Sequence, residues 1–132
     1  MKVNKPEDIL TLWIDYFNKA DVDNLADLYH SNSALIPTFA VDTLFNNHDI
    51  KAYMNECLNN HDAVVDIEHD SIKNQKLGND TYILSGMYTF TFNERGKEQY
   101  LSNFTFIIDL SFEKPILHHH SSYAFDVLST NI

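Results

Sequence analysis

The periodicity of apolar residues changes once along this chain, at Ala63, and that change limits the folds open to it. Before Ala63, apolar residues recur at intervals of three and four, which is typical of helices with one buried face. After it, apolar and polar residues alternate, which is typical of strands that bury one face of a sheet. Helices followed by long strands with short turns indicate the α+β class, with helices packed on one face of a curved antiparallel sheet.

The first half of the chain predicts three helices. The first begins at Pro6, because proline suits the first helical turn, and the second is a short helix over residues 23–29. The third can be capped by Asn46 or Asn47 and ends at residues 59–60. Its apolar residues follow helical spacing without a gap: Ile50, Tyr53, Met54, Cys57 and Leu58. Two short strands, over residues 34–37 and 41–45, are expected between the second and third helices.

The second half predicts four strands, over residues 63–70, 82–92, 100–110 and 115–125. The strand over residues 100–110 is apolar on both faces. Phe104, Phe106 and Ile108 lie on one side, and Leu101, Thr105 and Ile107 on the other. Two apolar faces need two coverings, so we expect the helices to cover one face and a second copy of the chain the other. The expected partner is therefore the same chain, in a homodimer formed through the sheet.

Charge excludes several classes of partner. The chain has 132 residues with 9 Lys+Arg against 19 Asp+Glu, and its net charge is −10. We expect no nucleic-acid and no membrane partner, because both kinds of binding depend on clustered Lys and Arg. The single arginine, Arg95, falls in a predicted turn, which argues against an arginine-clamped phosphate.

Cysteine content and hydropathy predict the compartment and the domain count. Cys57 is the one cysteine, so no internal disulfide can form, as is typical of a reducing compartment. The amino terminus has no apolar stretch of signal-peptide type, and no segment is apolar over the ~18–20 residues that span a bilayer. We expect a soluble, cytoplasmic protein with a single domain over residues 1–132.

The unusual segment is a run of three histidines followed by two serines near the end of the last strand. Because side chains alternate along a strand, His119 and Ser121 point to one face, and His118, His120 and Ser122 to the other. A His with a Ser two residues on, inside a cavity, can polarise water or hold an oxyanion. Spacing alone does not say which set faces the interior, and it favours hydrogen-bonded histidines at a dimer interface.

The sequence also holds candidates for other kinds of site. His118 and His120 share a face and, with His69, are candidates for a zinc site, but no spaced ligand signature is present. Neither serine lies in a glycine-flanked elbow of the serine hydrolases. Among carboxylates, Asp109 ends an apolar face and is a candidate base. Alternation places Asp66 and Glu68 on the polar face, while Tyr53 and Tyr88 fit core aromatics with hydrogen-bonded hydroxyls.

The order of elements resembles the nuclear transport factor 2 fold, a cone-shaped α+β domain that includes SnoaL-like cyclases and ketosteroid isomerases. Four stretches resemble the narrower group that contains the association domain of calcium/calmodulin-dependent protein kinase II and the iota-class carbonic anhydrases. They cover residues 25–29, 35–38, 85–90 and 118–122, within a resemblance over residues 7–124. The histidine–serine segment is the most specific of the four.

The resemblance implies a small-molecule ligand in the cone and, by analogy with the iota-class enzymes, hydration of carbon dioxide with neither metal nor other cofactor. It implies catalytic roles for Thr38, Tyr53, His119, His120, Ser121 and Ser122, and substrate-binding roles for Tyr88 and Asn103. Two alternatives stay open: a non-catalytic ligand-binding or oligomerisation module, and an isomerase- or cyclase-like enzyme. The chain departs from the group at Asn103, where an arginine is common, so we expect a pocket without a fixed strong cation.

Overall fold

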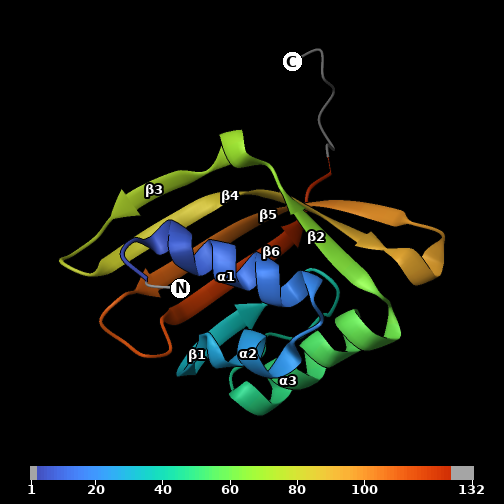
Figure 1. The fold of residues 1–132 in the computed structure, drawn as a ribbon, viewed down its shortest axis with the longest axis horizontal. Helices are drawn as coiled ribbons and strands as arrows, with labels where there is room; N and C mark the ends of the chain where they lie inside the picture. The colour runs from blue at the N-terminus through green and yellow to red at the C-terminus, as the bar shows by residue number, and fades with distance from the viewer. Residues whose placement is uncertain (1–2, 126–132) are drawn as a thin grey trace.

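The computed structural model describes residues 3–125, and its central feature is a curved six-stranded sheet (Figure 1). The strands lie in the order β1-β6-β5-β4-β2, and β3 pairs with β4 beside β2. The strands are β1 (Tyr29–Ile36), β2 (Ala63–Ile67), β3 (Lys73–Lys76), β4 (Thr81–Phe92), β5 (Glu98–Asp109) and β6 (Ile116–Tyr123). All pairs are antiparallel except β1 with β6. The predicted α+β class and cone-type fold are confirmed. The predicted domain also includes residues 1–2 and 126–132, which lie outside the described residues.

The helices begin where the sequence supplies caps. The first, α1 (Pro6–Asn18), has Pro6 in its first turn, and α2 (Val22–Asp27) is capped by the Asp21 carboxylate. The third, α3 (Asn47–Asn55), is capped by Asn46, whose side chain accepts from the Asp49 N–H at 2.9 Å. A π-helix, η1 (Glu56–Asn60), continues α3. Two 3₁₀ turns, η2 (His69–Ser71) and η3 (Asn93–Arg95), complete the elements.

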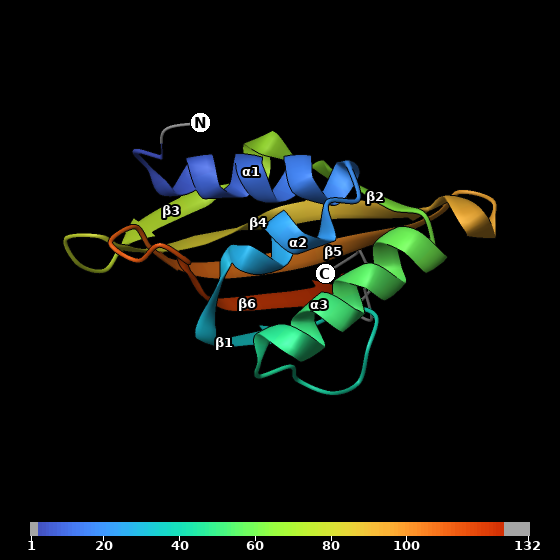
Figure 2. The same ribbon diagram turned by 60° about the horizontal axis from the view of Figure 1, so that its bottom comes forward.

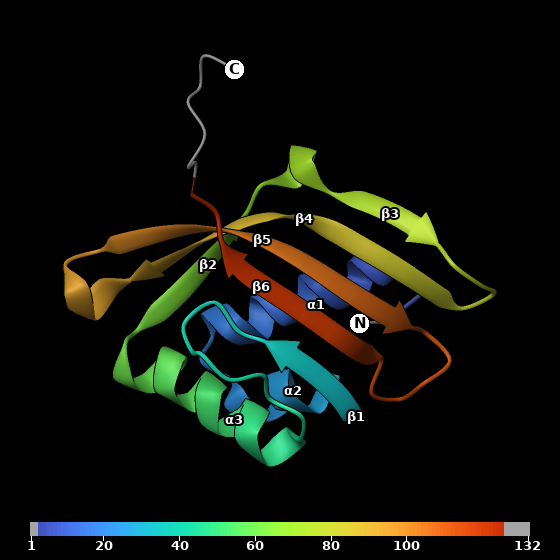
Figure 3. The same ribbon diagram turned by 180° about the vertical axis from the view of Figure 1, so that it is seen from behind.

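All three α-helices lie on the same face of the sheet (Figure 2). The core between helices and sheet includes Trp13, Ile50 and Met54 from the helices. From the sheet it receives alternate residues of β4, β5 and β6. The opposite face of β4, β5 and β6 carries none of the described helices (Figure 3). On that face Leu101 is 40% exposed, whereas Phe104 and Phe106 on the helical face are buried.

One glycine is required by this packing. Gly86 of β4 pairs with Phe104 of β5, and the Phe104 ring lies across it. A Cβ at position 86 would lie 2.7 Å from the ring carbon Cζ, closer than packed side chains allow. The glycine therefore lets Phe104 reach Tyr88, at 4.8 Å between ring centroids.

Several predicted boundaries were wrong. The second helix ends at Asp27, and Tyr29 begins β1 rather than lying on the helix, because its side chain is bound into the core. The strand predicted over residues 34–37 is the end of the longer β1. The strand predicted over residues 41–45 is reduced to one bridge between Leu35 and Leu44. The exposed β3 was missed, since its polar residues carry no apolar alternation.

Within residues 3–125, no helix has the length and apolar character needed to cross a membrane.

Candidate functional site

His119 lies on β6, between β1 and β5, and its side chain points toward the helices. It is 1% exposed, and Ser121 on the same face is 4% exposed. The imidazole stacks on Phe106 of the neighbouring strand, with 3.9 Å between ring centroids and 18° between planes. The fold thus answers the question that strand alternation leaves open: His119 and Ser121 face the interior.

A continuous hydrogen-bond chain runs through His119. Its Nδ1 lies 2.7 Å from the Tyr29 hydroxyl, which accepts from Trp13 Nε1 at 2.9 Å. Its Nε2 lies 3.0 Å from the Tyr88 hydroxyl. The Tyr88 hydroxyl donates to Ser121 Oγ at 2.5 Å, and Ser121 Oγ lies 2.5 Å from Thr38 Oγ1. Six side chains from α1, three strands and the loop after β1 are joined in one network: Trp13, Tyr29, His119, Tyr88, Ser121 and Thr38.

The donors in this network can be assigned by elimination. Because the Tyr29 hydroxyl accepts from Trp13, it can donate its own proton to His119 Nδ1. The Tyr88 proton is used toward Ser121, so Nε2 carries the imidazole proton and donates to Tyr88. Ser121 then donates to Thr38. In this arrangement every bond points the same way, and the Thr38 hydroxyl keeps the one proton that is free to donate to a ligand.

Burial keeps the network uncharged at neutral pH. Desolvation lowers the pKa of His119 well below its ordinary value, and His118 and His120 lower it further. Desolvation also raises the pKa values of the Tyr29 and Tyr88 hydroxyls. The site therefore presents a neutral imidazole between neutral phenols, and it can act as a hydrogen-bond donor without adding charge.

A small cavity of about 10 Å³ adjoins this network. It is lined by apolar side chains together with His119, Ser121, Tyr88 and Tyr53. This volume suits a single water molecule. The Tyr53 hydroxyl accepts from the backbone N–H of Phe39 at 3.3 Å, and burial raises the Tyr53 pKa. The Cys57 thiol beside it has its pKa raised by burial to about 11, so the thiol is protonated.

A second, larger pocket of about 490 Å³ opens beyond the small cavity. Apolar residues form most of its wall, and its ionisable side chains include Asp49, Glu56, His61 and Arg95. We call this space the outer pocket and the 10 Å³ space the inner cavity. Phe39, Tyr53 and Cys57 line both.

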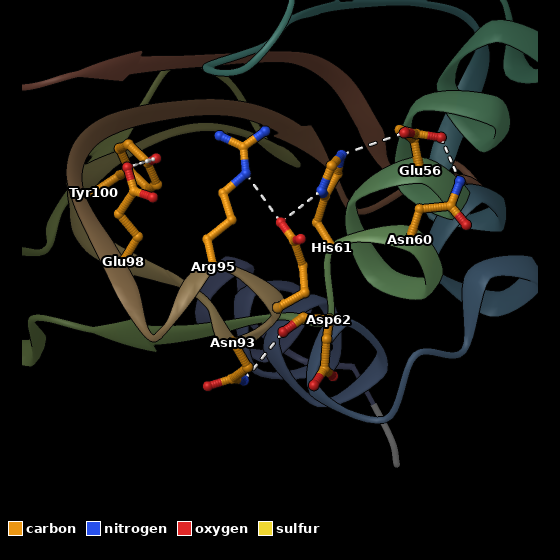
Figure 4. A network of polar contacts seen from close by, with 9 residues as sticks. Glu56, Asn60, His61, Asp62, Asn93, Arg95, Glu98 and Tyr100 are labelled. Carbon is orange, nitrogen blue, oxygen red and sulfur yellow. Dashed lines mark hydrogen bonds and ion pairs between the residues drawn. The ribbon is translucent and has the colours of Figure 1, made fainter.

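A polar network joins residues that line the outer pocket to the turn between β4 and β5 (Figure 4). His61 Nδ1 lies 2.9 Å from Glu94 Oε1, and its Nε2 lies 3.3 Å from Glu56 Oε1. Arg95 Nε lies 2.9 Å from the same Glu94 oxygen. The hydrogen bond from His61, followed by that from Arg95, lowers the pKa of Glu94. These contacts tie the end of η1 to the tip of the β4–β5 hairpin.

The expectation of a pocket without a fixed cation was wrong for the outer pocket. Arg95 does lie in the turn after β4, as predicted, but the hairpin brings that turn beside the end of η1. The position of the turn depends on how far β4 and β5 extend beyond the rest of the sheet, which residue spacing does not reveal.

The structure brings together five of the eight predicted site residues: Thr38, Tyr53, Tyr88, His119 and Ser121. The other three lie on the opposite face of the sheet. His120 and Asn103 are exposed there, and Ser122 pairs with Asn103 across β5 and β6. Strand alternation separates them from the inner cavity. His120, Ser122 and Asn103 can therefore contact only what lies on the open face of the sheet.

The described residues form neither the predicted zinc site nor a buried carboxylate base at Asp109, Asp66 or Glu68. Within residues 3–125, no three His, Cys, Asp or Glu side chains converge as metal ligands. Asp109 accepts from Thr81 Oγ1 and Ser111 Oγ at the end of β5, and the Ser111 bond lowers its pKa. Asp66 and Glu68 are exposed, as alternation predicts.

The sequence analysis did not identify Trp13, Tyr29 or His61 as members of these sites. Tyr29 fell within the predicted second helix. Trp13 lies in the helical core, but its indole N–H also donates the first hydrogen bond of the network. Since each acquires its partner from a distant segment, no local pattern marks it.

Comparison with known proteins gives the family. The family model of the calcium/calmodulin dependent protein kinase II association domain matches residues 7–124. A search of curated proteins by sequence found no match.

Solved structures give the fold. A protein from Xanthomonas campestris assigned to the same association domain has a TM-score of 0.79 at 23% identity, and the alignment covers 96% of each chain. An NTF2-like protein of unknown function from Shewanella oneidensis has a TM-score of 0.70 at 16% identity, over 88% of this chain and 94% of that one. An NTF2-like protein from Streptomyces avermitilis assigned as a dehydratase has a TM-score of 0.78 at 10% identity, over 91% and 94%.

The likeness to structures at these identities carries no activity across, since this fold hosts unrelated functions. The match of the family model spans nearly all the described residues, including the buried network and the wall of the inner cavity. The chain belongs to the calcium/calmodulin dependent protein kinase II association domain family.

Proposed function

We propose that this protein binds a small molecule in the cone and catalyses the reversible hydration of carbon dioxide at the inner cavity, with hydroxyl groups in place of a metal. The observation that carries the proposal is the hydrogen-bond chain from His119 to Thr38, beside a cavity the size of one water molecule. The resemblance to the iota-class carbonic anhydrases suggests the substrate.

In the proposed reaction, a water molecule in the inner cavity attacks the carbon of CO₂. A C–O bond forms, one C=O electron pair moves onto an oxygen, and the water proton leaves to a buffer base through the outer pocket. The Thr38 hydroxyl is the free donor of the chain, and it stabilises the oxygen that gains charge. Tyr53 is a second donor, since its hydroxyl accepts from Phe39 N–H and keeps its own proton. His119 stays neutral and orients the chain through Tyr88.

The test is stopped-flow CO₂ hydration with chelator-treated protein. Ser121→Ala breaks the chain between Tyr88 and Thr38, and its matched control, Ser122→Ala, removes the same hydroxyl from the opposite face. We expect a rate above buffer for the wild type and for Ser122→Ala, and a loss of about 10²-fold for Ser121→Ala. A wild-type rate equal to that of buffer would overturn the activity. Equal rates in the two variants would overturn the site.

The outer pocket supports a second candidate, a ligand-binding module without turnover. Its volume of about 490 Å³ is in the range of pockets for drug-sized ligands and far exceeds what CO₂ needs. If this protein binds a small molecule but shows no hydration activity, the result would favour the ligand-binding module. An isomerase- or cyclase-like reaction needs a base at the substrate, and the carboxylates that line the outer pocket, Asp49 and Glu56, are its candidates.

The proposal also includes a homodimer in the cytoplasm. The open face of the sheet supports the dimer, because strand alternation places Leu101, Ile107 and Met87 there, opposite the buried residues of β4 and β5. The single, buried Cys57 is consistent with a reducing compartment. Light scattering tests the dimer, and Leu101→Asp, which places a charge on the open face, should yield monomers. A wild-type monomer at micromolar concentration would contradict it.

A further inference from the structure

The outer pocket and the inner cavity share a layer of side chains in their walls. Three residues line both spaces: Phe39, Tyr53 and Cys57. On one side of this layer lies a ligand-sized space of about 490 Å³, and on the other a space of about 10 Å³ next to the Ser121 hydroxyl.

The three residues differ in how firmly the fold holds them. Tyr53 and Cys57 belong to α3 and η1, whose packing is anchored by the buried Ile50, Met54 and Leu58. Phe39 lies in the connection between β1 and α3, which is regular only at the Leu35–Leu44 bridge. The backbone of Tyr53 and Cys57 is held by helical hydrogen bonds, whereas that of Phe39 belongs to no helix or strand.

Phe39 is nevertheless well packed in the closed position. Its ring lies 5.3 Å from Phe90, 4.6 Å from Phe92 and 5.2 Å from Tyr100, measured between centroids. Its backbone N–H donates to the Tyr53 hydroxyl. The residue before it, Thr38, is the terminal hydroxyl of the network. The side chain shared by the two walls and the terminal hydroxyl of the network are therefore consecutive in the chain.

We propose that Phe39 is a partition between the two spaces and the specificity-determining residue of the site. With its ring in place, the inner cavity has room for a single water molecule, and the bulk of any ligand stays in the outer pocket. The statement about specificity rests on the proposed function. The partition itself does not, because it is a property of the packing.

The single tryptophan provides a direct readout of the partition. Trp13 lines the inner cavity and is 1% exposed, so its fluorescence reports whether a solute reaches that space. We would measure quenching by acrylamide, a small neutral solute, in the wild type, in Phe39→Ala and in Leu44→Ala. The control residue Leu44 lines the outer pocket but not the inner cavity. It is also an apolar residue of the same connection.

We expect weak quenching in the wild type and in Leu44→Ala, and a severalfold larger quenching constant in Phe39→Ala. Near-UV circular dichroism would show whether each variant is folded. If Phe39→Ala fails to fold, Phe39→Leu decides the matter, and its quenching should exceed that of Leu44→Ala. Quenching in the folded Phe39 variant that equals that of the wild type or of Leu44→Ala would overturn the partition.

The hydration assay separates this inference from the proposed function. If the wild type hydrates CO₂, Phe39→Ala should lower the rate, because water entering the cavity weakens the hydrogen bonds of the network. Val41→Ala, at a fully exposed residue of the same connection that lines neither space, should leave it unchanged. If the Phe39→Ala variant hydrates CO₂ at the wild-type rate, Phe39 does not determine specificity. An inactive wild type would remove the proposed reaction, while the fluorescence result would still decide the partition.

Discussion

His119 and His120 are consecutive residues with the same side chain, yet β6 places them in opposite environments. His119 is buried, stacked on Phe106 and bonded at both nitrogens, whereas His120 is exposed on the open face. The same contrast separates Ser121 from Ser122. Since the chemistry of the side chains is identical, burial and partners alone decide that one pair belongs to a network. Each residue on the open face is thus a matched control for its neighbour.

The largest expected effect is on stability. His119→Ala leaves a cavity and two buried tyrosine hydroxyls short of a partner, and it should lower the free energy of unfolding by about 3–5 kcal/mol. His120→Ala should change it by less than about 0.5 kcal/mol. Chemical denaturation at pH 7 measures both. Equal losses would mean that the buried position has no special role.

Removing one hydroxyl from the network is the next largest change. Tyr88→Phe keeps the ring but leaves His119 Nε2 without its acceptor and Ser121 without its donor. We expect a loss of about 1–3 kcal/mol in the free energy of unfolding. The control is Tyr123→Phe, since Tyr123 is 51% exposed, lies at the end of β6 and is not part of the network. Denaturation curves in which both variants match the wild type would contradict the network.

The pH dependence of stability gives a smaller effect. Burial lowers the pKa of His119 in the folded state, so below pH 6.5 the unfolded chain binds a proton at this residue that the folded chain does not. The stability that this group supplies is complete above about pH 6.5 and is lost as the pH falls, at up to about 1.4 kcal/mol per pH unit.

Comparing variants isolates the contribution of His119 to the pH dependence of stability. Between pH 6.5 and 5.5, the free energy of unfolding should fall more steeply for the wild type and for His120→Gln than for His119→Gln. The slopes are compared, and the absolute values are not, because His119→Gln is itself less stable. Parallel slopes in all three proteins would show that the folded state protonates His119 readily.

Prediction from the sequence succeeded where local pattern and local structure coincide. Proline and the spaced apolar residues of the first helix, and the Asn46 cap of the third, act within one or two turns. Prediction failed for residues 29 and 41–45. Tyr29 satisfies a helical spacing, but the bonds from its hydroxyl to Trp13 and His119 hold it at the start of β1.

The candidate site was predictable in part. The resemblance indicated Thr38, Tyr53, Tyr88, His119 and Ser121, all of which the structure brings together. It also indicated His120, Ser122 and Asn103, which alternation puts on the other face. Arg95 and His61 both line the outer pocket only because the tip of the β4–β5 hairpin lies beside the end of η1.

The sequence by itself determined the α+β order of elements, the buried stripes of the helices, and the division of the histidine–serine segment into two faces. These are properties of spacing, and spacing is local. The tertiary structure decided which face is the interior, what His119 bonds to, and that Phe39 stands between two cavities. His119 lies 90 residues from Tyr29, and Ser121 lies 83 residues from Thr38. Contacts over such separations form only when the sheet and helices pack around a common core, and no periodicity encodes them.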